Sequence, residues 1–258
     1  MTEINDHILA HAEAGVMTIR MNRPDKKNAI TGDMYARMAA ALDEAYERDD
    51  VKTVLFFGTP GAFSSGNDIA DFMQIAMSGK RDSMSVFDFL ERIIMAKKPV
   101  VAGVDGLAIG VGTTMLLHCD YVIASGNSRF KTPFVDLGLV PEAGSSLIAP
   151  EIIGHHKAFA LLAMGEGFDA DSAANAGFVN KVVDAEILEE TARQTASEIA
   201  AKPQQALNIS RNLIRGDRTP ILERMREEAV LFGERLESEE AKQAFMGFMA
   251  KGQAKKAG

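Results

Sequence analysis

The sequence predicts an α/β fold, in which a core of alternating strands and helices is followed by a helical region. Up to about residue 185, short apolar segments of strand length alternate with helical patterns, and beyond that point the pattern is helical throughout. Such alternation is typical of an α/β core. The 258 residues, 47% of them hydrophobic and 25% charged, are enough for one large domain with a substantial core.

The first elements are assigned from periodicity and turn residues. Residues 8–12 and 16–21 flank Glu13-Ala14-Gly15 and predict a hairpin, because the second arm alternates in the manner of a strand. A helix is predicted from Thr31, because five apolar residues recur three or four positions apart on one face. These residues are Met34, Met38, Ala41, Leu42 and Ala45. Apolar runs predict buried strands over 51–57 and 100–104, with a helix over 86–96 between them.

The later elements follow the same logic. Further strands are predicted over 121–124, 130–133 and 178–183, and an apolar helix is predicted to follow Gly112. The helical region is predicted to contain helices over 187–201, 204–215, 221–234 and 239–249. We find no internal repeat, linker or low-complexity block apart from the short Lys/Ala/Gly end after Lys251.

Charge and composition exclude several classes of function. The net charge of −8 disfavours nucleic-acid binding, which requires basic surface, although a local basic patch can still bind a phosphorylated small molecule. Cys119 is the only cysteine, so an intrachain disulfide and a cysteine-built zinc site are excluded. Neither a secretion signal nor an apolar run of about 20 residues is recognisable, so we expect a cytoplasmic protein without a membrane partner.

Two glycine-containing loops are candidates for binding an anion. Ser64-Ser65-Gly66-Asn67-Asp68 and Gly110-Val111-Gly112 each follow a hydrophobic strand and open a helix, where backbone N–H groups have no partner within the helix. Two such groups converging on one oxygen would form an oxyanion hole. Alternatively, the glycines serve turn geometry alone. A dinucleotide site at the second loop is a poor option, because its glycines are not in the G-x-G-x-x-G order.

The order of several separated motifs identifies a family resemblance. The motifs are Asn22-Arg23-Pro24, Asn28-Ala29, Phe63 to Ile69, Gly106 to Gly110, and Pro133 through Gly144-Ser145-Ser146. Together they resemble the enoyl-CoA hydratase/isomerase (crotonase) family, from about Ile8 to Lys251. The resemblance implies a spiral of ββα units and a C-terminal helical trimerisation region. It divides the chain into an acyl-CoA-binding catalytic core over 1–195 and an oligomerisation and CoA-covering region over 196–258.

The resemblance also implies the ligand and its site. A CoA thioester would place its carbonyl oxygen between the backbone N–H groups of Asn67 and Val111. No separate cofactor and no metal are implied, because CoA is part of the substrate, and the assembly would be a trimer or a dimer of trimers. The implied CoA-binding residues are Lys26, Lys27, Ala29, Ser65, Gly66, Asp68, Ile69, Ala70, Phe248 and Lys251. From the residues alone, Lys26 and Lys27 are equally an ordinary solvated loop, and Asp68 equally a helix cap.

Departures from the family pattern bear on the reaction. Hydratases of this family carry one glutamate three residues after the second oxyanion donor, where this chain has Thr114. Their other glutamate directly follows the proline of the 130–133 strand, where this chain has Phe134. Adding water to an alkene requires a base for the water and an acid for carbon. The sequence is therefore a poor match to a hydratase.

One carboxylate occurs elsewhere in the matching region, at Glu142. The segment from Leu139 to Ser146, with the motifs around Ser65 and Thr132, looks like the peroxisomal-type 3,2-enoyl-CoA isomerases, in which the matching glutamate is the single acid/base. Apolar surroundings of Phe134, Leu137, Leu139 and Val140 would raise the pKa of this group. Phe134, Leu137 and Leu139 are also assigned to the acyl pocket. Without the resemblance, Glu142 reads as a solvated turn residue. Other hypotheses are a hydratase, another crotonase-type reaction, and a non-catalytic acyl-CoA-binding protein.

Overall fold

Six strands form the larger of two sheets in the computed structural model, which describes residues 7–70 and 84–254. Their spatial order is β1 (Ile8–Glu13), β2 (Val16–Met21), β3 (Thr53–Phe57), β5 (Val100–Val104), β7 (Tyr121–Ser125) and β10 (Lys181–Val183). β1 and β2 form the predicted antiparallel hairpin, whose turn residues Ala14 and Gly15 both have positive φ, and the other neighbouring strands are parallel.

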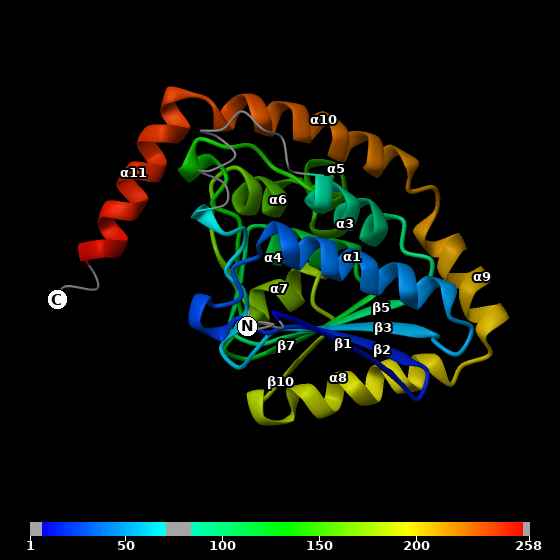
Figure 1. Cartoon of the computed structure of the whole chain (residues 1–258). Coiled ribbons are helices and arrows are strands. Elements are labelled where there is room, and N and C mark those ends of the chain that lie inside the picture. The colour runs from blue at the N-terminus through cyan, green and yellow to red at the C-terminus, as the bar shows by residue number, and fades with distance from the viewer. Residues whose placement is uncertain (1–6, 71–83, 255–258) are drawn as a thin grey trace, which may run out of the picture.

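The larger sheet is covered on both faces, which explains why its central strands are continuous apolar runs. Val54 and Phe56 of β3 face a core that includes α1 (Gly32–Glu47) and α3 (Met84–Ile94). The alternate residues Leu55 and Phe57 belong to a second cluster with residues of α8 (Ala185–Ala200). Figure 1 shows α8 beneath the sheet and α1 and α3 above it.

Helix α1 matches its prediction closely. Thr31 caps it by accepting a hydrogen bond at its side chain from the Met34 N–H group at 3.3 Å. The five predicted core residues of this helix are all buried. The 3.6-residue period of the sequence is therefore sufficient to orient α1 against the sheet.

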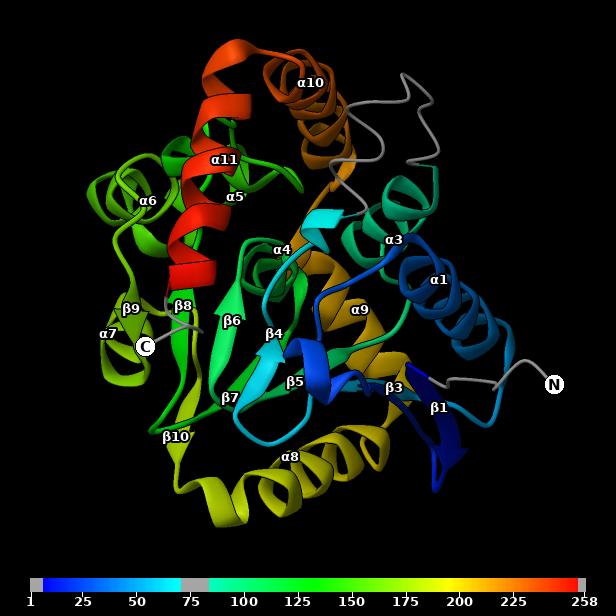
Figure 2. The same ribbon diagram turned by 60° about the vertical axis from the view of Figure 1, so that its left-hand side comes forward.

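The smaller sheet positions the candidate site. It contains β4 (Ala62–Ser64), β6 (Leu107–Ile109), β8 (Arg129–Lys131) and β9 (Phe168–Asp169) in that order. Three successive strand pairs, β3–β4, β5–β6 and β7–β8, each place one strand in the larger sheet and the next in the smaller sheet. This alternation is the expected crotonase-like spiral, and it places the parallel strands β4 and β6 side by side, so the loops that follow them meet at one edge (Figure 2).

Several predicted boundaries are wrong. The strand predicted over 130–133 ends at Lys131, because Pro133 has no N–H for a ladder and the Thr132 hydroxyl donates to Leu161 O instead. The strand predicted over 178–183 is confined to β10, since Phe178 packs its ring against Phe130. The apolar helix after Gly112 is short: α4 (Val111–Thr114) continues as the 3-10 turn η2 (Met115–His118).

The remaining helices lie mainly in the second half of the chain. The sequence did not predict the short elements η1 (Pro24–Lys26), η3 (Val135–Leu137), α5 (Ser145–Ile153), α6 (His155–Leu162) and α7 (Ala170–Ala176). The longer helices α9 (Gln204–Arg215), α10 (Thr219–Leu236) and α11 (Glu239–Ala254) match predicted helices. The proposed division between 195 and 196 falls inside α8 and stays a prediction. Within residues 7–70 and 84–254, every helix is too short or too polar to span a lipid bilayer.

Candidate active site

Glycines bring the loops after β4 and β6 into close contact. A Cβ atom on Gly66 would lie 2.9 Å from the carbonyl oxygen of Ile109, and one on Gly112 would lie 3.0 Å from Ser64 O. Gly66 and Gly110 also have positive φ angles of 90° and 56°. L-residues rarely adopt these angles, so Gly66 and Gly110 are required for the backbone conformation. Gly66 and Gly112 are required for the close approach of the two loops. The two predicted oxyanion loops therefore lie together.

The backbone N–H groups of Asn67 and Val111 point away from the hydrogen bonds that hold the two loops. Asn67 forms a parallel bridge with Ile30. The N–H group of Ile30 donates to Gly66 O at 2.8 Å, and its carbonyl oxygen accepts from Asp68 N–H at 2.9 Å. In this pairing, the N–H group of the bridging residue points away from its partner. Val111 is the first residue of α4, where an N–H group has no acceptor within the helix. Both amides are thus suited to a ligand oxygen.

The loop after β2 is fixed against the loop after β4. Ser65 donates from its backbone N–H to Lys27 O at 2.9 Å and from its hydroxyl to Lys26 O at 3.2 Å. The buried Asn28 side chain donates to Ala62 O at 2.7 Å and accepts from Arg23 N–H at 2.7 Å. Asn28 thereby ties the loop after β2 to strand β4, beside the predicted CoA-binding residues. Its positioning role was not predicted, although asparagine tolerates the positive φ found there.

The predicted CoA-binding residues differ in how far the structure places them. Asp68 is linked to Arg23 at 2.6 Å and accepts from Ala70 N–H at 2.9 Å, so it both holds the loop and caps the turn at Ile69 and Ala70. Lys26 and Lys27 have exposed side chains on the rim, and the half-buried Ala29 accepts from Arg23 at 3.0 Å. Phe248 and Lys251 lie in α11, and their side chains fall outside the described residues.

Glu142 is buried rather than solvated. Its side chain, 9% exposed, accepts a hydrogen bond at Oε1 from the Thr114 hydroxyl at 3.0 Å. Thr114 is the last residue of α4, so this contact ties the carboxyl group to the helix that begins with Val111. Burial raises the pKa of Glu142 to about 7; the hydrogen bond from Thr114 opposes this rise, and the charge of Glu228 adds to it.

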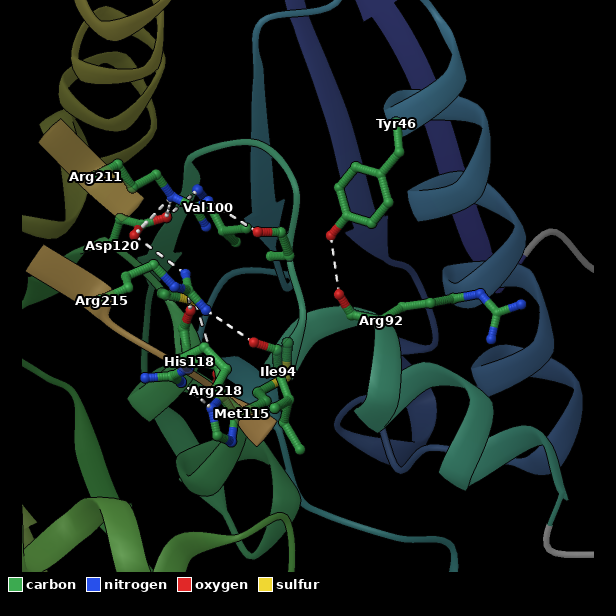
Figure 3. Close-up of polar contacts among 12 residues, drawn as sticks. Tyr46, Arg92, Ile94, Val100, Met115, His118, Asp120, Arg211, Arg215 and Arg218 are labelled. Carbon is green, nitrogen blue, oxygen red and sulfur yellow. Dashed lines mark hydrogen bonds and ion pairs between the residues drawn. The ribbon is translucent and has the colours of Figure 1, made fainter. Parts of the chain in front are cut away.

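His118 holds the turn that follows Glu142. Its Nε2 lies 2.8 Å from Ala143 O, and its Nδ1 lies 3.0 Å from the Arg218 guanidinium (Figure 3). Since the carbonyl must accept and the guanidinium must donate, His118 is neutral with its proton on Nε2. Burial, assisted by Arg218, lowers its pKa to about 3. This contact supports Ala143 in its left-handed conformation (φ 62°).

Tyr35 of α1 contacts the first of the two predicted oxyanion loops. Its buried hydroxyl donates to Asn67 Oδ1 at 2.5 Å. Burial raises the pKa of this hydroxyl well above its usual value, and the charge of Glu142 raises it further. Sequence reasoning missed Tyr35, Thr114 as a hydrogen-bond donor, and His118; the only signal was a polar group on an apolar helical face.

The predicted acyl-pocket residues lie in the surrounding apolar core. Phe134 and Leu139 are buried in the same cluster as Val111 and Ala143, and the half-buried Leu137 packs against it. The Phe134 carbonyl holds this segment by accepting from Leu137 N–H at 3.0 Å and Leu139 N–H at 2.8 Å. That these residues line an acyl pocket remains a prediction.

The arrangement suits proton transfer beside a carbonyl group. It combines a buried carboxyl group, whose pKa is raised to about 7, with two backbone amides in loops at one edge of the smaller sheet. A base of this pKa can both remove and return a proton, while the amides stabilise the resulting oxyanion.

Comparison with known proteins agrees with this fold. The model of the enoyl-CoA hydratase/isomerase family matches residues 11–256. A mouse protein described as peroxisomal enoyl-CoA delta isomerase 3 is 34% identical over 247 residues, which cover 94% of this chain and 78% of that protein. A short-chain-enoyl-CoA hydratase of Clostridium acetobutylicum is 31% identical over 252 residues and covers 96% of each chain.

A crystal structure gives the same result in three dimensions. It is that of an enoyl-CoA hydratase/isomerase from Pseudoalteromonas atlantica T6c, which aligns with a TM-score of 0.89 and 37% identity over 95% of this chain and 97% of that chain. Family model, relatives and structure agree over nearly the whole length. The chain belongs to the enoyl-CoA hydratase/isomerase, or crotonase, family and is an acyl-CoA enzyme.

Proposed function

We propose that the protein is an isomerase that converts a 3-enoyl-CoA into a 2-enoyl-CoA, with Glu142 as the single acid/base. The observation that carries this proposal is the buried Glu142 carboxyl group, which Thr114 attaches to the helix of the second oxyanion donor at 3.0 Å. At the two positions where hydratases of the family carry glutamates, this chain has Thr114 and Phe134. A double-bond shift needs only one group that moves a proton.

In this reaction, the Glu142 carboxylate removes a proton from C2 of the substrate. The electron pair of the C2–H bond enters the thioester, whose oxygen accepts hydrogen bonds from the N–H groups of Asn67 and Val111. The dienolate then takes the same proton back from Glu142 at C4, and the double bond forms between C2 and C3. No atom is gained or lost, so the chemistry requires neither water nor a cofactor.

The CoA part of the substrate is assigned to the rim of the site. The adenine nucleotide would lie along Lys26, Lys27 and Ala29 and along the stretch from Ser65 to Ala70, with Phe248 and Lys251 covering it. Lys26 and Lys27 are exposed next to the loop that Asn28 fixes. Their ammonium groups can therefore approach phosphate groups without the energetic cost of burying a charge. Phe134, Leu137 and Leu139 would contact the acyl chain.

A hydratase is the second candidate, because one of the relatives above is described as a short-chain-enoyl-CoA hydratase. Hydration would need a second acid beside Glu142. The other nearby carboxylate, Glu228, has its two oxygens engaged by the N–H groups of Gly144 and Ser146 at 2.6 and 2.9 Å. It is therefore poorly placed to activate water, which favours isomerisation.

The experiment follows the ultraviolet band of the conjugated enoyl thioester. We expect the band to grow when the protein is mixed with a 3-enoyl-CoA and to persist with a 2-enoyl-CoA. Replacing Glu142 with Gln should lower the isomerase kcat by about 10²–10⁴-fold. The matched control is Glu151→Gln, an exposed residue of α5 that should leave kcat unchanged.

Other outcomes would contradict the proposal in distinct ways. Loss of the band from the 2-enoyl-CoA would identify a hydratase. Binding of both thioesters without any change would favour the non-catalytic role. An active Glu142→Gln variant would show that another group carries the proton.

A further inference from the structure

We propose that Glu228 of α10 is a positioning residue for Glu142: its carboxylate holds the backbone amides that follow Glu142 and places a negative charge at the start of α5. The inference rests on the proposed role of Glu142 as the acid/base. Glu228 is distant in sequence and does not belong to the motifs that carry the family resemblance.

The contacts of Glu228 are specific to this turn. The side chain is buried, 4% exposed, and its Oε2 and Oε1 accept hydrogen bonds from Gly144 N–H at 2.6 Å and Ser146 N–H at 2.9 Å. Helix α10 approaches the turn so closely that a Cβ atom on Gly144 would lie 2.6 Å from Ile221 Cγ2. The backbone after Glu142 is thus fixed by α10 on one side and by His118 on the other.

This clamp explains a conformation that is otherwise unfavourable. Ala143 and Gly144 have consecutive positive φ angles of 62° and 69°, and a left-handed alanine persists only where its surroundings determine it. Ser145 N–H closes the turn by donating to Glu142 O at 3.0 Å. His118 and Glu228 hold Ala143, Gly144 and Ser146, which directly follow Glu142. Loosening these contacts would therefore displace the Glu142 carboxyl group relative to Thr114.

Glu228 also affects the charge on Glu142. The N-terminus of α5 carries the partial positive charge of the helix dipole, which would favour an ionised carboxylate next to it. The negative charge of Glu228 opposes that effect and raises the pKa of Glu142. The other groups that face this pair are Tyr35 of α1, Thr114 of α4, the neutral His118 of η2 and Arg224 of α10. Burial raises the pKa of Glu228 itself, while its hydrogen bonds from Ser146 and Gly144 and the charge of Arg224 oppose that rise.

The test is the pH dependence of kcat/KM for isomerisation in Glu228→Gln. Loss of the charge should move the acid-side midpoint to lower pH by about one unit. The matched control, Glu223→Gln, makes the same charge change at an exposed position of α10 and should leave the midpoint unchanged. Thr114→Val removes a hydrogen bond that favours the carboxylate, so it should move the midpoint the opposite way.

A merely structural role would lower kcat equally at every pH without moving the midpoint, and a midpoint equal to that of the wild type would overturn the proposal. Should Glu228→Gln fail to fold, Glu228→Asp remains decisive. It keeps the charge but shortens the reach to Gly144 and Ser146, so kcat should fall about tenfold with the midpoint retained. An unchanged kcat in Glu228→Asp would equally overturn the proposal.

A second measurement separates this inference from the proposed function. Infrared spectroscopy of the protein without substrate follows the protonated carboxyl band that disappears in Glu142→Gln, and its titration reports the Glu142 pKa directly. An active Glu142→Gln variant would contradict the proposed function. The effect of Glu228 on Glu142 is tested separately, because it requires the band to titrate at lower pH in Glu228→Gln than in the wild type. An unshifted band with an inactive Glu142→Gln variant would overturn the role of Glu228 alone.

Discussion

The acid–base properties of Glu142 are set mainly by burial rather than by a charged partner. Loss of hydration raises the pKa of this carboxyl group to about 7, and a hydrogen bond from the neutral hydroxyl of Thr114 opposes the rise. A residue of this kind has two measurable consequences, one for the pH dependence of the rate and one for stability.

We expect the kcat/KM of isomerisation to fall below neutral pH. The base must be ionised to remove the C2 proton, so activity should follow a single ionisation with a midpoint near the pKa of about 7. The measurement is kcat/KM across the acid range in buffers of constant ionic strength. A midpoint close to the ordinary glutamate value would show that the catalytic base is solvent-exposed and is not Glu142.

Burial of Glu142 should also make the protein less stable as the pH rises. The pKa of this group is about 4.5 in the unfolded chain and about 7 in the fold, so the folded state binds the proton more tightly in between. Stability from this group is complete below the lower value and is lost as the pH rises through the higher one. Between about pH 5 and about pH 8, the loss should be of the order of 2–3 kcal/mol.

The check is urea unfolding of the wild type and Glu142→Gln at both pH values and one protein concentration. The Gln variant should lack this loss, because its side chain does not ionise and still accepts the Thr114 hydrogen bond. An equal change of unfolding free energy with pH in the two proteins would contradict the assignment.

At the scale of elements, α4 allows the proposed oxyanion donor to be removed selectively. Proline is tolerated at the first position of a helix, where its missing N–H group serves no backbone hydrogen bond. We therefore expect Val111→Pro to fold but to lose about 10²–10³-fold in kcat, the usual effect of deleting one oxyanion donor. Val111→Ala keeps the N–H group and should retain kcat while losing stability through a smaller core side chain.

The measurement is kcat on a 3-enoyl-CoA together with circular dichroism to verify folding. Equal rates for the proline and alanine variants would remove Val111 from the oxyanion hole. A joint loss of both rate and ellipticity in the proline variant would instead show that the start of α4 requires its native backbone.

Helix α9 shows how the C-terminal helices are attached to the core. Arg211 and Arg215 reach Asp120 at 2.9 and 3.2 Å, and Arg215 also donates to Ile94 O at 3.0 Å (Figure 3). These guanidinium groups fix one face of α9. The opposite face remains apolar and exposed, with Leu213 at 80% and Ile214 at 85%.

For the whole molecule, this exposed face supports the prediction of a trimer or a dimer of trimers. Exposed large apolar residues recur on the later helices at Val230, Leu231 and Met246, and exposed apolar surface is typical of association sites. Light scattering should give three or six times the chain mass of 27.8 kDa. Leu213→Glu should lower that mass, and a monomeric wild type would contradict the prediction.

The sequence by itself determined the features that depend on local pattern. The periodicity of α1 placed its five core residues, the turn at Ala14 and Gly15 placed the hairpin, and the ordered motifs placed the family and the two oxyanion loops. The helix and the hairpin depend on residues close together in the chain, where spacing converts directly into geometry, and the family assignment depends on the order of several short motifs. The short elements of the 145–176 region were not predicted, because helices of seven to nine residues have little periodic pattern.

Only the tertiary structure decided which polar groups meet at the candidate site. Thr114 and Glu142 are 28 residues apart, Tyr35 and Asn67 are 32 apart, and Gly144 and Glu228 are 84 apart, yet each pair shares a hydrogen bond. In the sequence, Glu142 resembles a solvated turn residue. Its pKa near neutrality arises from the apolar core and from α10, which packs against the turn, and desolvation of this kind is a property of the folded surroundings that no local pattern contains.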